Sequence, residues 1–378
     1  MRIREIRCAG LRGATPEGGW DEELQADDCV HTLVLIVTEE GLTGLGSAFT
    51  SEALVKGALD LMWPLLRSEN ALEPERVAEK LHQHTFWTGR GGSVTHAISA
   101  VDIAMWDILG KAVGQPVGRL LGGRYRETVM PYASVLMDYP DRMADVLLPL
   151  RDRGYRAIKM GWGPFGREDQ GLDERIVSES RSLVGDECLL MVDAGASDAF
   201  WTKGYKWALR TAHMLADYDV GWFEEPLAPD AMADFEQLRV HAPLPIAGGE
   251  VLTRRQTFKP WLDRGCFDIV QPDVTKVGGI SESRRIGRMA EDAGVRYIPH
   301  GWNTACGLAA DLHLASAFPG TDLVEYIAGS AYVDELRAGS WCLDANGHLA
   351  IPDNPGLGLE LDPDAVARYT GQRDFLNP

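Results

Sequence analysis

Three carboxylates follow short apolar runs, and their placement is the first sign of chemistry in this sequence. Asp193 follows Leu189–Val192, Glu224 follows Val220–Phe223, and Glu250 stands a few residues after another such run. Carboxylates brought together without a basic partner repel one another unless a cation lies between them, and hard oxygen ligands favour Mg²⁺. A single acid in such a place is usually a helix cap or a surface charge. Three in succession predict a metal site.

A histidine and a second aspartate occupy equivalent places further along the chain. His300 follows the apolar run Val295–Pro299, and Asp273 follows the run before it. An aspartate at the end of the neighbouring strand can hydrogen-bond one ring nitrogen of His300 and leave the other to act as a base. Lys159 and Glu325 end two more runs. We expect Lys159 to place a cation on the other side of the site.

The elements that must position these residues are short strands alternating with helices. Most of the apolar runs have a length typical of strands buried on both faces and too short for helices. The segments Asp230–Val240, Arg254–Asp263 and Ser281–Ala293 are each long enough for one helix. Chemistry restricted to the carboxyl ends of alternating strands is the pattern of a (β/α) barrel. Thr128–Val135 and Arg156–Lys159 are the first two predicted barrel strands.

A separate domain precedes the barrel. Strands are predicted at Met1–Ala9, His31–Thr38 and Leu45–Phe49, with a long loop over Gly13–Asp28, and helices from Glu52 to Val113. We therefore predict an α+β capping domain over residues 1–125 and a catalytic barrel over residues 126–346. The Gly- and Pro-rich segment 347–378 is long enough to return to the capping domain.

Composition narrows the class of protein. The chain has 378 residues, a formal net charge of −19 and 45% hydrophobic residues. Such an acidic balance argues against nucleic acid or an anionic membrane as partner. The six cysteines form no CxxC pair, and no apolar run approaches the roughly 18 residues of a membrane span. The expectation is a reduced, cytoplasmic enzyme.

These motifs together resemble the enolase superfamily, and within it the mandelate racemase subgroup. The matching positions are Lys159, Asp193, Glu224-Glu225-Pro226, Gly249-Glu250, Pro272-Asp273, Lys276-Val277-Gly278-Gly279, His300 and Glu325, with Ala97–Gly123 at the domain junction. The resemblance implies a modified (β/α)₇β barrel of TIM type under an α+β N-terminal capping domain. It implies Mg²⁺ on Asp193, Glu224 and Glu250, but not on Glu225, with the His300–Asp273 dyad as base and acid. Superfamily sites of this kind stabilise an enediolate on the metal.

Lys159 and Glu325 are the remaining expected catalytic residues. Lys159 would add positive charge at the substrate carboxylate, and Glu325, if protonated, would donate a hydrogen bond to it. Racemases of the subgroup carry lysine at both ends of a Lys-x-Lys motif, and here the second position is Gly161. Gly195 likewise stands where the family often has asparagine. The two glycines are interpreted as room for a longer polyol chain.

With one acid/base group evident, elimination is favoured over racemisation. The first hypothesis is dehydration of a sugar acid, an aldonate or aldarate, to a 2-keto-3-deoxy acid. Cycloisomerase or racemase/epimerase action in the same fold is the alternative, and a non-catalytic scaffold is disfavoured by the intact motifs. Trp20, Trp162, Trp302 and Asn303 are candidate pocket residues. The resemblance also implies a homo-oligomer that acts on a small carboxylate.

Overall fold

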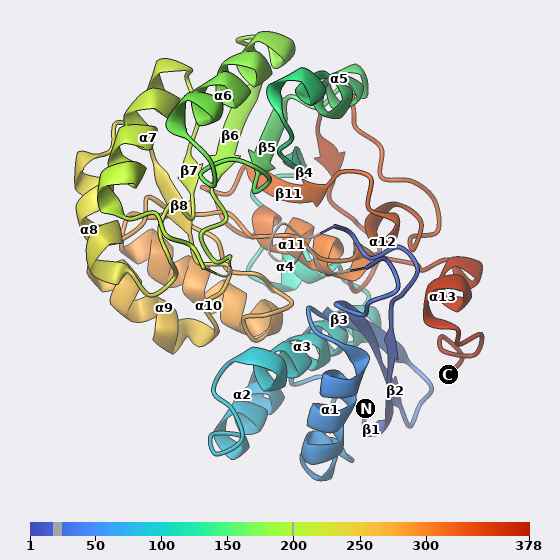
Figure 1. The fold of residues 1–378 in the computed structure, drawn as a ribbon. Coiled ribbons are helices and arrows are strands. Elements are labelled where there is room, and N and C mark those ends of the chain that lie inside the picture. The colour runs from blue at the N-terminus through green and yellow to red at the C-terminus, as the bar shows by residue number, and fades with distance from the viewer. Residues whose placement is uncertain (18–24, 199) are drawn as a thin grey trace.

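The computed structural model describes residues 1–17, 25–198 and 200–378, and it has two main parts (Figure 1). The N-terminal part begins with the antiparallel sheet β1 (Ile3–Gly10), β2 (Thr32–Thr38) and β3 (Thr43–Ala48). It continues with helices α1 (Glu52–Leu66), α2 (Pro74–His84), α3 (Gly92–Val113) and the short α4 (Val117–Leu120). Helix α3 is buried nearly all round, as its apolar sequence predicts, and it ends at Gly114 in the left-handed conformation (φ 66°).

The second part is a parallel barrel in which strands and helices alternate. The strands are β4 (Thr128–Leu136), β5 (Ala157–Gly161), β6 (Leu189–Asp193), β7 (Phe223–Glu224), β8 (Ile246–Gly248), β9 (Ile269–Val270), β10 (Arg296–Tyr297) and β11 (Leu323–Ile327). The helices are α5 (Met143–Asp152), α6 (Gln170–Val184), α7 (Tyr205–Asp217), α8 (Met232–His241), α9 (Arg254–Asp263), α10 (Gly279–Asp292) and α11 (Ala305–Ser316). The described residues thus form βα units β4–α5 through β10–α11 and then β11, which confirms the (β/α)₇β prediction.

Strand order explains how distant residues reach one site. The sheet runs β10-β9-β8-β7-β6-β5-β4-β11, so consecutive strands pair in parallel and β11 returns to β4. All carboxyl ends therefore lie at one mouth of the barrel. The predicted strand bounds differ by up to three residues from the observed ones, and α10 begins at Gly279 rather than Ser281.

The C-terminal segment crosses back toward the sheet of the capping domain. After α12 (Ala331–Asp334), β12 (Leu349–Ala350) pairs antiparallel with β4, and α13 (Pro363–Thr370) packs near β1. The Arg12 amide donates to the Tyr369 carbonyl at 2.9 Å. We propose that the capping domain ends near residue 125 and that this segment fastens it to the barrel.

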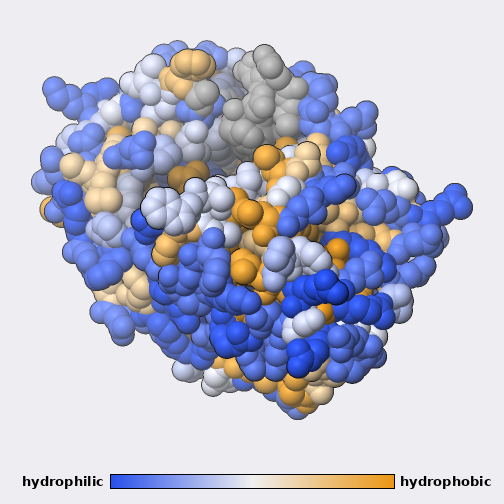
Figure 2. Space-filling model, turned by 90° about the horizontal axis from the view of Figure 1, so that it is seen from below, coloured by the Kyte–Doolittle hydropathy of each residue, from blue (hydrophilic) through white to orange (hydrophobic). Residues whose placement is uncertain are grey.

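Surface chemistry agrees with the charged composition. Seen from the side of the capping domain, most of the surface is hydrophilic, and hydrophobic residues gather in a limited central band (Figure 2). Among the described residues, no helix combines the length and apolar composition needed to cross a bilayer.

A buried polar contact joins the two parts. Asp102, on α3, accepts hydrogen bonds from the Ser281 amide at 2.9 Å and from the Ser281 hydroxyl, at the start of α10. Trp106 Nε1 also donates to the Ser281 hydroxyl, at 2.9 Å. A carboxyl from the capping domain therefore caps a barrel helix, where its amides are otherwise unpaired.

This contact leads to a prediction about stability. Burial raises the pKa of Asp102 to about 7, against the lowering effect of the Ser281 hydrogen bonds and with a further rise from Glu282 and Glu75. The pKa of Asp102 is higher in the folded chain than its unfolded value near 3.8, so the protonated carboxyl stabilises the fold. This contribution is fully present below pH 3.8 and is lost as the pH rises through 7. We expect the advantage of the native chain over Asp102→Asn in free energy of unfolding to shrink by up to about 4 kcal/mol from pH 4 to pH 8. The difference between their melting temperatures, measured across this pH range, should shrink with it. The exposed control Asp60→Asn should show no such trend, and a constant difference for Asp102→Asn would contradict the prediction.

Candidate active site

A cavity of about 220 Å³ opens where the barrel strands end. Its lining comes from seven barrel strands or the loops after them, and from the capping domain through Phe49. The lining residues are Phe49, Ser134, Val135, Leu136, Lys159, Gly161, Trp162, Asp193, Ser197, Glu250, Val251, Lys276, His300, Trp302 and Glu325. Apolar walls with a few convergent charged groups are typical of a small-molecule site.

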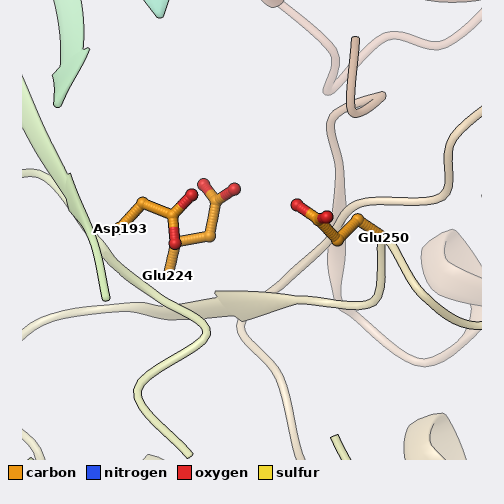
Figure 3. Close-up of side chains that lie close together, drawn as sticks. All are labelled: Asp193, Glu224 and Glu250. Atoms are coloured by element: carbon orange, nitrogen blue, oxygen red, sulfur yellow. The ribbon is translucent and has the colours of Figure 1, made fainter. Parts of the chain in front are cut away.

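Three carboxylates converge at one side of this cavity. Asp193, Glu224 and Glu250 each offer an oxygen, and these oxygens lie within 4.8 Å of one another. Their carboxylate groups point toward a common space from three successive strand ends (Figure 3). Glu224 is oriented by Trp222 Nε1 at 2.9 Å and Gln271 Nε2 at 2.8 Å, both donating to Oε2. Such supported ligands are typical of a preorganised metal site.

The electrostatics of the cluster fit a divalent cation. Burial, and next the neighbouring charge of Glu224, raise the pKa of Asp193 to about 8. Negative charge in this buried cluster is therefore costly unless a cation is near. An all-oxygen ligand set suits a hard cation. Glu225 is not part of the cluster. It has positive φ (40°), and burial and Glu250 raise the pKa of its carboxyl well above the ordinary value.

Lys159 corrects the expectation that the carboxylates lack a basic partner. Its Nζ lies 2.5 Å from Glu224 Oε1, 2.9 Å from Glu325 Oε1 and 3.5 Å from Asp193 Oδ2. The lysine is therefore beside the carboxylate cluster, not across the site from it. Burial lowers its pKa, but Glu224, Glu325 and Asp193 outweigh burial and hold the pKa well above the ordinary value. Lys159 is thus a cation and not a base in this arrangement.

His300 and Asp273 form the predicted dyad. His300 Nδ1 lies 2.8 Å from Asp273 Oδ2, while Asp273 Oδ1 accepts from the amide and hydroxyl of Thr275 at 2.7 and 2.6 Å. The carboxylate is therefore fixed on one side and holds the imidazole on the other. The other ring nitrogen, Nε2, lies 3.0 Å from Glu250 Oε2. Glu250 thus contacts the dyad and belongs to the carboxylate cluster as well.

Glu325 does not fit the expectation of a protonated acid. It accepts a hydrogen bond from the Gly301 amide at 2.7 Å and pairs with Lys159. Burial favours the neutral form, yet Lys159 and His300 outweigh it and keep the pKa of Glu325 below its ordinary value. A second lysine of the site, Lys276, has its Nζ 3.6 Å from Glu250 and 3.8 Å from Asp273. The predicted hydrogen-bond donor is an acceptor in this structure.

The candidate pocket residues have different outcomes. Trp162 and Trp302 line the cavity, and Trp302 Nε1 has no partner among the described residues. Asn303 was expected there, but its side chain is buried outside the cavity and donates to Asp311 Oδ2 at 3.2 Å. Trp20 lies outside the described residues. Sequence reasoning missed two serines that line the cavity, Ser134 within β4 and Ser197 in the loop after β6, because serine is too common a residue type to draw notice.

The structure gives the two glycines a different reason from room for a polyol chain. A Cβ on Gly195 would lie 2.3 Å from the Trp162 indole, so this ring fills the place of the missing side chain. A Cβ on Gly161 would lie 2.7 Å from the Asp193 Cβ. Both positions are small because neighbouring functional side chains pack against them.

Comparison with known proteins identifies the family. Residues 142–365 match the description "Enolase C-terminal domain-like", and residues 26–122 match "Mandelate racemase / muconate lactonizing enzyme, N-terminal domain". The chain belongs to the mandelate racemase subgroup of the enolase superfamily. The resemblance found from its motifs is thus confirmed.

Relatives of this enolase-superfamily member include two kinds of enzyme. D-galactarolactone cycloisomerase of Agrobacterium fabrum is 32% identical, over 98% of this chain and 99% of the relative. D-xylonate dehydratase of Haloferax volcanii is also 32% identical, over 91% and 86%. The crystal structure of 3,6-anhydro-D-galactonate cycloisomerase from Zobellia galactanivorans has a TM-score of 0.87 at 29% identity, over 98% and 99% of the two chains.

Proposed function

We propose that this protein is a Mg²⁺-dependent lyase that dehydrates a sugar acid to a 2-keto-3-deoxy acid. The observation that carries the proposal is the joining of the dyad to the carboxylate cluster through Glu250, in a cavity whose β5 wall is Gly161 and Trp162. Relatives at about the same identity are named as dehydratases of sugar acids, such as D-xylonate. The roles of the individual residues below belong to this proposal.

Asp193, Glu224 and Glu250 would hold Mg²⁺. When bound, the ion supplies positive charge at the substrate carboxylate and so makes the proton on the neighbouring carbon more acidic. Lys159 adds a second, permanent positive charge beside the same carboxylates. These charges oppose the repulsion that a substrate anion would otherwise meet in an acidic pocket.

His300 transfers both protons. In its neutral form Nε2 removes the proton from the α-carbon, while Asp273 accepts a hydrogen bond from Nδ1 and stabilises the imidazolium. The imidazolium then gives its proton to the hydroxyl leaving from the β-carbon, which departs as water. The carbon–oxygen bond breaks as the double bond forms, and the enol product becomes the 2-keto acid. Glu325 orients the loop through the Gly301 amide.

The testing experiment is a screen of aldonates and aldarates with Mg²⁺, in which 2-keto acid products are detected. We expect turnover of at least one sugar acid and none after EDTA treatment. The absence of any 2-keto product across the library would count against dehydration.

The second candidate is a cycloisomerase, and a specific observation favours it. The cycloisomerases from Agrobacterium fabrum and Zobellia galactanivorans align with nearly the full length of this chain. If the β-oxygen belongs to a ring, the same proton removal opens the ring, and the product is an isomer of the substrate rather than a dehydrated acid. Sugar lactones and anhydro-sugar acids in the same screen, with product mass measured, separate the two reactions.

The geometry also predicts the stereochemistry. Gly161 occupies the position at which racemases carry their second base. The cation nearest to it in sequence, Lys159, is paired with carboxylates that keep its pKa high. We therefore expect syn elimination and no exchange between the C2 epimers of the substrate. NMR of a competent acid in D₂O with Mg²⁺ measures both, and recovered starting material with inverted C2 would contradict the prediction. Gly161→Lys should not create a base, because its Cβ would displace Asp193.

Three remaining features stay predictions. We propose a homo-oligomer, because proteins of this family generally assemble, and a cytoplasmic location, because the chain's six cysteines are free in the structure. We also propose that neither nucleic acid nor a membrane is a partner, because the net charge is strongly negative.

A further inference from the structure

Trp162 stands in an unusual backbone conformation at the wall of the cavity. It follows β5 directly, has φ of 60°, and lines the cavity with its side chain largely buried. A bulky residue rarely adopts positive φ, so the surrounding structure must hold it there. Strain of this kind is most often kept at functional sites.

Two neighbours hold the indole in place. The first is Gly195, in the loop after β6. The ring occupies the space that a side chain at this position would fill. The second is Arg167, whose guanidinium lies 5.5 Å from the centre of the Trp162 ring and 5.1 Å from that of Trp201. A guanidinium over an indole face is an attractive contact.

Arg167 is itself fixed by the loop after β6. It donates to the carbonyls of Ala194 at 3.0 Å and Gly195 at 3.4 Å, and to Asp198 Oδ2 at 3.1 Å. A planar fork of donors can make these bonds while its face rests on a ring, which lysine cannot do. Arg167 therefore joins the loops after β5 and β6 behind the cavity wall.

The strand order places this wall opposite the dyad. In the order of the eight barrel strands β5 is four places from β9, which Asp273 follows, so Trp162 and the dyad approach the cavity from opposite sides. A substrate whose α-carbon faces His300 would therefore present its other face to the Trp162 side. Trp162 lines the cavity, and an indole ring is an apolar surface for the C–H groups of a carbon chain and carries no base.

We propose that Arg167 is a positioning residue for substrate specificity, because it holds Trp162 as the wall on which the carbon chain of the sugar acid lies. The inference rests on the proposed function for the identity of the ligand. It assigns to Arg167 no contact with the reacting atoms.

The kinetic test is a double-mutant cycle on the sugar acid found in the screen. Arg167→Met should raise KM about tenfold and leave kcat within about twofold, because binding and not proton transfer is affected. Trp162→Leu should do the same, and the double variant should be no worse than either single variant. Arg167→Lys should be intermediate. A KM effect of Arg167→Met that persists in full in the Trp162→Leu background would overturn the proposal.

The matched control is Arg153→Met. Arg153 also lies over an aromatic ring, 5.5 Å from that of Tyr155, but neither residue lines the cavity. Its KM should equal that of the native chain. Mg²⁺ affinity should be unchanged in both arginine variants, and a loss in Arg167→Met would assign its effect to the neighbouring metal cluster and overturn the proposal.

A spectroscopic readout does not depend on turnover. With 5-fluorotryptophan incorporated, the ¹⁹F resonance of Trp162 is identified by its loss in Trp162→Leu. We expect this resonance to shift or broaden in ligand-free Arg167→Met and to stay unchanged in Arg153→Met. An unchanged resonance in Arg167→Met would overturn the positioning role. If that resonance moves but no acid in the library is turned over, the proposed function fails and the positioning of Trp162 by Arg167 stands.

Discussion

Replacement of His300 by Asn is expected to abolish both dehydration and exchange of the substrate α-proton with solvent. One ring performs both proton transfers in the proposed mechanism, so removing it leaves neither the base nor the acid. The expected loss in kcat is about 10³- to 10⁴-fold, within the range that general acid–base groups supply. Asparagine keeps polarity and approximate size, so Mg²⁺ binding should remain. NMR in D₂O measures exchange and product formation in one sample.

Asp273→Asn is the matched comparison. The amide would fill the same space but carries no negative charge to accept the Nδ1 hydrogen bond. The imidazole would therefore lose its orientation, and its positive charge would lose its stabilisation. We expect a retained Kd for the sugar acid and a kcat reduced by at least about 100-fold. Substantial exchange by His300→Asn would show that another base exists. Lys159 would then be examined first, although its three carboxylate neighbours argue against it.

Loss of any one carboxylate of the cluster is also expected to have a large effect, on Mg²⁺ binding and on turnover. Asp193→Asn, Glu224→Gln and Glu250→Gln should each weaken Mg²⁺ binding by at least about 100-fold and abolish turnover, because each removes a charged oxygen ligand. Titration calorimetry with Mg²⁺ measures the affinity independently of activity. The native chain should also lose activity in EDTA and regain it when Mg²⁺ is restored.

Glu225→Gln is the control for this series. Glu225 is adjacent to Glu224 and equally buried, but it offers no oxygen to the cluster. Its replacement should leave Mg²⁺ affinity close to that of the native chain. Equal losses from Glu225→Gln and Glu224→Gln would mean that the cluster has been assigned to the wrong glutamate. Full native activity in EDTA would remove the metal from the mechanism.

The identity of the chemical groups and the strand ends that carry them were readable from the sequence. Asp193, Glu224, Asp273 and His300 all follow runs whose length predicts buried parallel strands. In a parallel barrel, residues at the carboxyl ends of strands meet at one mouth whatever their separation in the chain. The barrel, the carboxylate cluster and the dyad geometry therefore followed from local pattern and strand alternation.

The direction of other side chains was decided only by the tertiary structure. Lys159 turns toward Glu224 and Glu325 because buried charges must be paired, and the pattern of one strand does not show which neighbour will pair with it. Asn303 comes soon after His300 in the chain, yet it turns to Asp311, away from the cavity.

The two glycines show the same limit. Gly195 is small because the Trp162 ring, from the preceding strand end, occupies its place, and Arg167 rests on that ring from behind. These contacts join residues from separate loops, whose close packing depends on shapes that no strand or helix period encodes. The sequence by itself determined which groups reach the mouth of the barrel. Packing among the loops decided which of these groups form ion pairs, and which of them line the cavity.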